Sequence, residues 1–133
     1  MLVRLRETYN KDTYLPASFI SDGTINILAL IIALYFEEKP LIVIEEPERN
    51  LHPSLLPRVV EMLKEASTNK QIIVTTQSAE IVRHTDLADL LFITRDAKGY
   101  SEIYRPGEKE EIKTFLQNEV GIEDLYIQNL LGV

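Results

Sequence analysis

The sequence contains no cysteine and no long apolar run. Without cysteine the chain can form no disulfide, carry out no thiol chemistry and offer no thiolate to a metal. Its longest uninterrupted apolar run, residues 27–36, is well short of a membrane span. The sequence does not begin with basic residues followed by an apolar core, so nothing in it indicates a signal peptide. We therefore expect a cytoplasmic protein that makes no contact with a membrane.

Clustered positive charge is also missing. The formal net charge is -7 and the sequence pI is about 4.8. Proteins that bind nucleic acid neutralise its phosphates with lysine and arginine, and this supplies much of their affinity. We therefore expect contact with DNA only indirectly, through other parts of an assembly.

The overall composition is that of an ordinary folded protein. Hydrophobic residues make up 45% of the chain and charged residues 26%, which is unlike a disordered tail. A chain of 133 residues is one domain-sized unit that can bury a core of its own. Because no linker, repeat or low-complexity stretch interrupts it, we expect a single domain over residues 1–133.

Two adjacent carboxylates follow a strand-forming apolar run. Residues 41–44 are Leu, Ile, Val and Ile, and Glu45 and Glu46 come next, before a turn at Pro47. The run predicts a strand buried on both faces, as in a parallel sheet, with its charges where ligands of open α/β sheets bind. Alternatively, Glu45 and Glu46 simply end a strand and lead into a turn.

A capped apolar helix is predicted before this strand. It begins with Ser21, Asp22, Gly23 and Thr24. Residues 25–36 are apolar on nearly every helical face, so we expect the helix to be buried. Ser21 or Asp22 can cap it, and Gly23 lets a ligand approach the backbone, which makes an anion site suited to phosphate. The alternative is an ordinary capped core helix.

A second apolar strand ends in polar side chains. Residues 71–74 are followed by the hydrogen-bonding residues 75–78. In a parallel sheet this polar tip would lie beside that of the first strand, where it could bind phosphate oxygens or orient a water. Ser78 is better explained as the N-cap of a helix at residues 79–83.

The turn after the carboxylates carries two further polar groups. Asn50 and His52 are expected to project next to the carboxylates. Pro53 is well placed at the first position of a helix that runs through about Glu65. His52 could equally be a surface residue with no function of its own.

Beyond residue 83 the pattern indicates scaffold. The expected elements are a buried strand at 90–94, a hairpin turn at 96–99, a strand at 101–105, an amphipathic helix at 108–118 and a short helix at 123–131.

Taken in order, the polar segments resemble the second half of an ABC-type ATPase domain of the SMC, RecF and OLD-like group, often labelled AAA ATPases. Residues 21–24 resemble the ABC signature, 41–46 the Walker B strand, 50–53 the D-loop and 75–78 the switch segment. The likeness begins at residues 2–5 and ends at residues 124–132, which are similar to the closing segment of OLD-like ATPases. It implies an α/β fold with a mostly parallel sheet flanked by helices, like the C-terminal part of a P-loop NTPase domain.

The resemblance also implies roles for individual residues. Glu45 would help to hold Mg²⁺ through its hydration shell, and Glu46 would polarise the water that attacks ATP. Gln77 stands where many relatives carry His, and a neutral amide can bond the γ-phosphate but cannot carry a proton, so we predict slow hydrolysis. The residues that would contact the nucleotide are Ser21, Asp22, Gly23, Asn50 and His52.

The Gly-rich loop that ends in Gly-Lys-Ser or Gly-Lys-Thr and cradles the ATP phosphates is absent. None of the five glycines precedes a lysine. The Walker A half must therefore come from another segment or polypeptide, so the chain is either a C-terminal piece of a longer ATPase or a degenerate relative. Faces meant for that lobe would be exposed, and we expect a dimer or a larger assembly.

Two functions stay open from the sequence. The first is half of an ATPase that hydrolyses ATP only with a Walker A lobe, and the second is a non-catalytic interaction or regulatory module. A metal-dependent nuclease ranks third, because its site would need an Asp-x-Asp pair and none of the six aspartates is so placed.

Overall fold

The structure is a computed structural model that describes residues 4–6, 9, 14–108, 121, 124 and 127. It divides into two compact units, Met1–Thr76 and Gln77–Val133. The helices predicted at 108–118 and 123–131 lie outside the described residues, apart from Glu108, Asp124 and Ile127.

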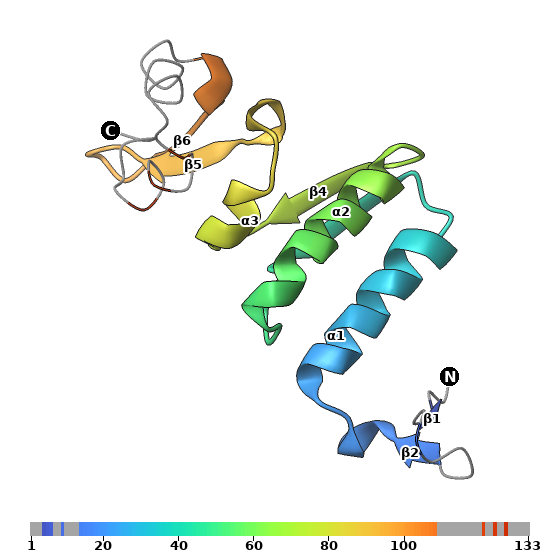
Figure 1. The fold of residues 1–133 in the computed structure, drawn as a ribbon. Helices are drawn as coiled ribbons and strands as arrows, with labels where there is room; N and C mark the ends of the chain where they lie inside the picture. Colours follow the sequence, from blue (N-terminus) through green and yellow to red (C-terminus); the bar gives the residue numbers. More distant parts are fainter. Residues whose placement is uncertain are drawn as a thin grey trace. The chain divides into compact units, whose positions relative to one another are not determined.

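In its described residues, the first unit combines short strands with two α-helices (Figure 1). In chain order its elements are β1 (Arg4–Arg6), β2 (Tyr14–Pro16), α1 (Asp22–Ile31), β3 (Leu41–Glu45), α2 (Leu56–Ser67) and β4 (Gln71–Thr75). A π-helical turn, Ile32–Phe36, extends α1, and 3₁₀ turns at Ala17–Phe19 and Pro53–Leu55 precede α1 and α2. β1 and β2 pair antiparallel, whereas β3 and β4 pair in parallel.

Side chains fix both ends of the α1 segment. Ser21 is the N-cap, because its Oγ accepts a hydrogen bond from the backbone N–H of Thr24 at 3.2 Å. Beyond the π-helical turn, Lys70 Nζ donates to the carbonyls of Leu34 and Glu37 at 2.9 and 2.6 Å. A cation at this end bonds carbonyls that the helix leaves without partners, and it suits the helix dipole. Of the two caps that the sequence left open, Ser21 and Asp22, Ser21 is the N-cap.

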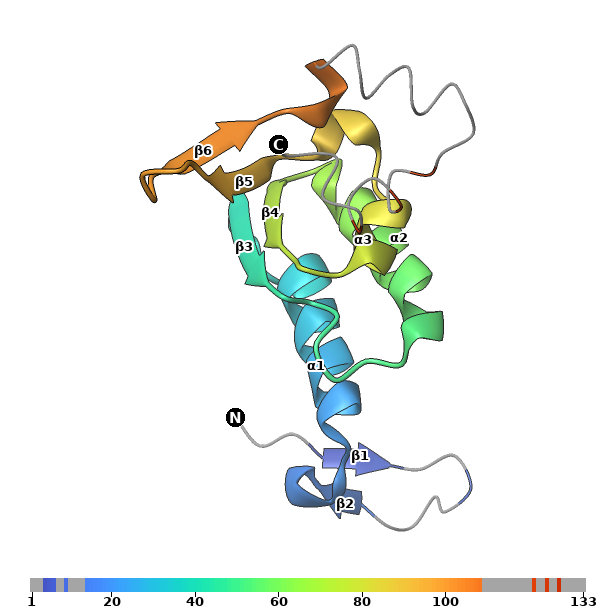
Figure 2. The same ribbon diagram turned by 90° about the vertical axis from the view of Figure 1, so that its left-hand side faces the viewer.

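The core of the first unit lies between the two helices and the β3–β4 sheet. Leu30 and Leu34 meet the buried side of α2, and Ile44, Ile72 and Val74 of the sheet pack against the same cluster. The buried residues of α2 follow the spacing of one helical face; they are Leu56, Val59, Val60, Leu63 and Ala66. Figure 2 shows both helices on one side of β3 and β4. One face of the sheet is thus covered.

The other face of the β3–β4 sheet is open. Side chains alternate along a strand, so Leu41, Val43 and Ile73 point away from the helices. Their exposed fractions are 47%, 64% and 44%. The prediction that residues 41–44 form a strand buried on both faces is therefore wrong, because the described helices of this unit cover only one of them.

The apolar helix is also less buried than its sequence predicts. Leu30 and Leu34 are buried, but Ile32 and Phe36 are exposed. A helix that is apolar all round needs neighbours on every side, and α2 with the sheet supplies them on one side only. The prediction that this helix is buried on all faces is wrong for the described part of the chain.

Over residues 77–108, the second unit contains one short helix and a β-hairpin. Its elements are α3 (Ala79–Arg83), β5 (Phe92–Arg95) and β6 (Ser101–Tyr104), with 3₁₀ turns at Leu87–Asp89 and Pro106–Glu108. β5 and β6 pair antiparallel. In the turn between them, Asp96 Oδ1 accepts from the N–H of Lys98 at 2.9 Å, and Gly99 has a φ of 85°. The predicted hairpin turn is confirmed, but Ile93 is 67% exposed, so the strand expected to be buried is open on one side.

The predicted α/β architecture, with parallel strands flanked by helices, is confirmed by the β3–β4 pair and its covering helices. The other two strand pairs are antiparallel. Within the described part of the chain, no helix has the length and hydropathy that crossing a membrane requires.

Candidate functional site

Two polar strand ends lie side by side in the first unit. Glu45 is the register partner of Thr75 in the parallel β3–β4 pair. Immediately beyond, the N–H of Glu46 donates to the carbonyl of Thr75 at 2.8 Å. The prediction that the two polar tips are neighbours is confirmed. Because ligands of α/β sheets bind beyond the carboxyl ends of parallel strands, this edge is the candidate site.

The backbone turns sharply at Glu46. Its φ is 44°, in the left-handed region, which costs an ordinary side chain about 1–2 kcal/mol. The N–H of Arg49 donates to the carbonyl of Glu46 at 3.0 Å, and the turn closes at Asn50, whose φ is 61°. Asparagine tolerates this conformation better than glutamate does. Strain of this kind persists where the surroundings impose it, and it is common at functional sites.

The adjacent carboxylates have different surroundings. Glu45 continues the alternation of Leu41 and Val43, so it lies on the open face of the sheet and is exposed. Glu46 follows the last ladder pair and is half-buried. The exposed group can reach a hydrated cation, whereas the turn holds the base of the Glu46 side chain in place.

The turn after β3 packs directly on the first turn of α1. A Cβ on Gly23 would lie 2.5 Å from the carbonyl oxygen of Asn50, a distance that real side chains do not adopt. Close by, Asn26 Nδ2 donates to the carbonyl of Arg49 at 2.7 Å. The segments predicted as signature and D-loop are thus in contact. Gly23 is required by this backbone approach, and its contact with a ligand stays a prediction.

Ser21 and Asp22 are exposed at the start of α1. Ser21 Oγ bonds Thr24 twice, through the backbone N–H at 3.2 Å and the hydroxyl at 2.8 Å. Asp22 stands in the first turn, where a carboxylate complements the helix dipole. Capping accounts for Ser21 and the helix dipole favours Asp22, so the contact of either with a nucleotide stays a prediction.

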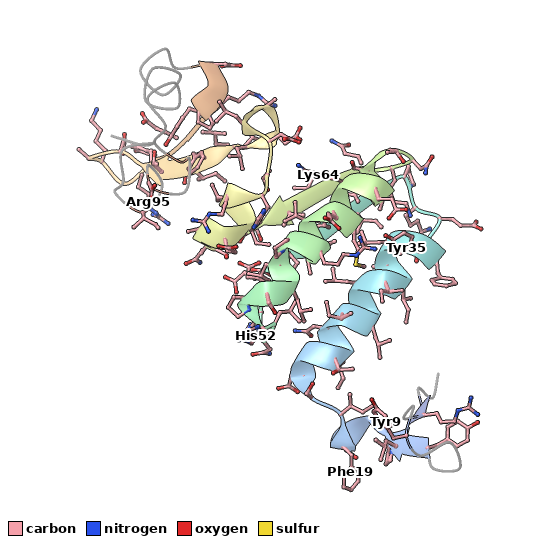
Figure 3. The ribbon with its side chains drawn as sticks, viewed as in Figure 1. Tyr9, Phe19, Tyr35, His52, Lys64 and Arg95 are labelled. Carbon is pink, nitrogen blue, oxygen red and sulfur yellow. The ribbon has the colours of Figure 1, made fainter. Side chains whose placement is uncertain are left out.

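His52 caps the 3₁₀ turn that leads into α2, and Figure 3 shows it at that end of the helix. Its Nδ1 accepts from the N–H of Ser54 at 3.3 Å and bonds the Ser54 hydroxyl at 2.8 Å. These bonds assign the proton of the neutral ring to Nε2. Pro53 begins a 3₁₀ turn rather than the predicted α-helix, which starts at Leu56 and ends at Ser67, close to the predicted end at about Glu65.

Glu48 is a part of the site that the sequence did not single out. Its Oε1 accepts a hydrogen bond from the hydroxyl of Thr76 at 2.5 Å, in a partly buried position. Its Oε2 is shielded from solvent and has no hydrogen-bond partner among the described residues. A glutamate after a proline in a turn ordinarily points to solvent, so only the partner 28 positions away reveals the contact.

Gln77 and Ser78 begin the second unit. Ser78 Oγ accepts from the N–H of Ile81 at 3.4 Å, which confirms Ser78 as the N-cap of α3. Gln77 is exposed and follows Thr76 directly in the sequence. Its role in a switch segment stays a prediction.

The fit of these residues to a divalent cation is partial. In the described ranges, no group of three or more His, Asp or Glu side chains could hold a metal ion by itself. Mg²⁺ is nevertheless commonly bound by one or two carboxylates together with water and substrate phosphates. Glu45 fits that pattern, with the remaining ligands coming from a nucleotide and solvent.

Three of the solved structures that are similar to the chain come from SMC proteins. A chain from work on ATP-driven dimerization and DNA-stimulated activation of SMC ATPases aligns with a TM-score of 0.60 and 18% identity, over 83% of this chain and 67% of that one. The SMC head bound to the C-terminal winged-helix domain of ScpA gives 0.61 and 20%, over 70% and 28%. The SMC head domain from Thermotoga maritima gives 0.56 and 24%, over 77% and 38%.

These likenesses establish that the chain has the fold of an SMC ATPase head. The sequence identities are too low to establish anything beyond the fold. The chain spans only 28% and 38% of the length of the second and third of these structures. No curated protein is a significant match. A family model does match, over residues 5–83, and its description is "AAA domain, putative AbiEii toxin, Type IV TA system". Since the match covers more than half of the chain, the protein belongs to this AAA domain family.

Proposed function

We propose that the chain supplies one half of an ATP-binding and ATP-hydrolysing site, and that residues 1–133 act as one domain in it. This half provides the signature, Walker B, D-loop and switch segments. The Walker A loop that cradles the phosphates would come from another segment or polypeptide, since the chain has no such loop. Membership of an AAA domain family and the fold of an SMC head support the proposal.

The observation that carries the proposal is the position of Glu45. It lies at the carboxyl end of β3 on the same open face as Leu41, Val43 and Ile73. If a second lobe buried these apolar side chains, the hydrophobic effect would stabilise the complex. The lobe would then also lie next to the Glu45 carboxylate. One docking event would thus cover the open face and complete a site at its edge.

In the proposed site, the carboxylates and Gln77 would act on different parts of the ATP–Mg²⁺ complex. Mg²⁺, when bound, would neutralise phosphate charge, with Glu45 holding its hydration shell. Glu46 would polarise the attacking water from a backbone that the turn holds in place. Gln77 would bond the γ-phosphate without moving a proton, so turnover would be slow. The groups proposed to contact the nucleotide from the α1 start and the turn are Ser21, Asp22, Gly23, Asn50 and His52.

Assembly follows the same logic. The similar SMC ATPases undergo ATP-driven dimerization, and one SMC head binds a domain of ScpA. We propose, by analogy, that two copies of this half meet across nucleotide held by their Walker A lobes, giving a dimer. The net charge of -7 argues against a direct grip on DNA.

A second candidate is a non-catalytic interaction or regulatory module. The open apolar face and the exposed side of the α1 segment favour it, since both need a partner whether or not ATP is present. On this view Glu45 and Glu46 would end a strand and do no chemistry.

Calorimetry with ATP and Mg²⁺ distinguishes the two functions. It would be run on the chain alone and on its mixture with a polypeptide that carries the Walker A loop, such as one encoded immediately upstream. We expect binding only in the mixture. Absence of binding in both samples would leave the interaction module as the better explanation. Tight binding by the chain alone would contradict the inference that the phosphate-binding loop must come from another segment or polypeptide.

Replacing Glu46 by Gln tests its proposed chemistry. The amide keeps the size of the side chain but polarises water poorly, so we expect turnover by the mixture to fall at least about 100-fold. ATP-dependent association should persist. Glu38→Gln, an exposed substitution in the loop before β3, is the matched control. Unchanged turnover in Glu46→Gln would remove the role assigned to this residue.

A further inference from the structure

The hydrogen bond between Glu48 and Thr76 joins two segments at a boundary of the molecule. Thr76 is the last residue of the first unit, and Gln77 is the first residue of the second. The ladder with β3 ends one residue earlier, at the pair Glu45 and Thr75. The hydroxyl of Thr76 then donates to Glu48 Oε1 at 2.5 Å. This contact extends the attachment of the chain beyond the end of the sheet.

Glu48 is itself held by the turn after β3. Its carbonyl accepts from the N–H of Leu51 at 3.0 Å, and the same turn is closed by Arg49 N–H donating to the Glu46 carbonyl at 3.0 Å. The side chain therefore extends from a fixed backbone. A hydroxyl that donates to a carboxylate oxygen makes one of the stronger hydrogen bonds in proteins, and partial burial protects it from competition by water.

The two carboxylate oxygens of Glu48 differ in their surroundings. Oε2 is shielded from solvent and has no hydrogen-bond partner among the described residues. A shielded polar atom without a partner is unfavourable. Well-packed apolar side chains in place of a hydrogen-bonded pair often cost little. Unlike an apolar contact, the hydrogen bond is directional, so it fixes the Thr76 side chain at one point of the turn.

We propose that Glu48 is a positioning residue. Through Thr76 it fixes the point at which the chain leaves the first unit, and so the base from which Gln77 projects. The consequence for ATP hydrolysis rests on the function proposed above, with Gln77 at the γ-phosphate. The attachment itself is independent of that function and can be tested on the chain without ATP.

Hydrogen exchange on the full chain measures the attachment directly. The observed quantity is the exchange rate of backbone amides in residues 75–78. In Glu48→Ala and Thr76→Val we expect these amides to exchange about tenfold faster, since a charge-assisted hydrogen bond has been lost. Thr76→Ser keeps the donor and should exchange like the original chain, whereas Glu48→Gln keeps an acceptor without the charge and should lie between the original chain and Glu48→Ala. Unchanged exchange in the first pair, or equal acceleration in all four, would overturn the proposal.

A double variant covers the case in which a single variant does not fold. Glu48→Met with Thr76→Val removes both polar partners and leaves no lone group buried, so it should fold. Fast exchange confined to residues 75–78 in this variant supports the attachment, and exchange like that of the original chain overturns it.

Turnover by the mixture with the Walker A polypeptide then tests the consequence. Thr76→Val should lower kcat about tenfold with KM little changed, and Thr76→Ser should restore it. A merely structural role would lower the stability of Thr76→Val and leave the kcat of the folded fraction unchanged, which would contradict the positioning role. If the unaltered mixture hydrolyses no ATP, the proposed function fails, while the exchange rates still decide the attachment.

Discussion

The two faces of the β3–β4 sheet have similar sequences and different surroundings. On one face, Ile44, Ile72 and Val74 pack against the core formed with α1 and α2. On the other, Leu41, Val43 and Ile73 are close to half exposed or more. Apolar side chains leave water only when something covers them, and the described residues of the first unit cover one face of this sheet and not the other.

The contrast reappears along the α1 segment. Leu30 and Leu34 face the core, whereas Ile32 and Phe36 do not. Exposed apolar area that forms a continuous patch is typical of a surface that binds a partner. In both elements a residue's partner, rather than its type, decides whether it is buried.

The largest expected effect compares neighbouring isoleucines on the two faces. Ile72→Ala removes a side chain packed on the core and should lower the free energy of unfolding by about 2–3 kcal/mol. Ile73→Ala lies in the same strand and loses the same β propensity, but the Ile73 side chain is 44% exposed. The free energy of unfolding should therefore fall by less than about 1 kcal/mol. Urea denaturation of the isolated chain measures both.

A large loss in Ile73→Ala would contradict the open face. It would mean that residues outside the described ranges, or a second copy of the chain, already cover this side. Repeating the denaturation at two protein concentrations separates these cases, because only an assembly makes the midpoint depend on concentration.

The local structure was largely predictable from the sequence. Helix caps and turns depend on neighbouring residues, so Ser21, Ser78, Pro53 and the turn at Asp96 could be assigned without a fold. The pairing of β3 with β4 was also predictable, because two short apolar runs with polar ends fit a parallel sheet.

Contacts between distant segments were not predictable in the same way. Gly23 is needed because the backbone of Asn50 approaches it, and Glu48 matters because Thr76 lies within reach. Neither partner is near in the sequence. The exposure of Val43 escaped prediction for a related reason, since an apolar run shows what could be buried but not what is present to bury it.

The next effect concerns association rather than folding. Val43→Asp places a charge on the open face at a position that is 64% exposed, so the isolated chain should lose only about 1 kcal/mol, mainly through the lower β propensity of Asp. If the Walker A lobe covers this face, burying the charge should weaken its binding at least about 100-fold. Calorimetric titration of the two polypeptides gives the affinity.

Ile93→Asp is the matched control for this prediction. Ile93 is 67% exposed, but it belongs to β5 in the second unit. If Ile93→Asp weakens association and Val43→Asp does not, the partner binds the hairpin instead of the open face. Equal and small effects from both would remove the argument that joins the open face to Glu45.

The smallest effect lies at the border between covered and open surface, where Tyr35 donates a hydrogen bond from its hydroxyl to Glu65 Oε2 at 2.8 Å. This bond, with some burial and the nearby charge, raises the pKa of Tyr35 above its ordinary value near 10. The unfolded tyrosine therefore ionises first, so this contribution to stability is complete below about pH 10 and is lost as the pH rises further. Tyr35→Phe should lack that part of the alkaline loss. The measurement is the urea midpoint as a function of pH between about pH 8 and pH 11. Tyr100→Phe, at an exposed site, is the control. If the midpoint falls with pH equally steeply in Tyr35→Phe and in the original chain, solvent screens the bond completely.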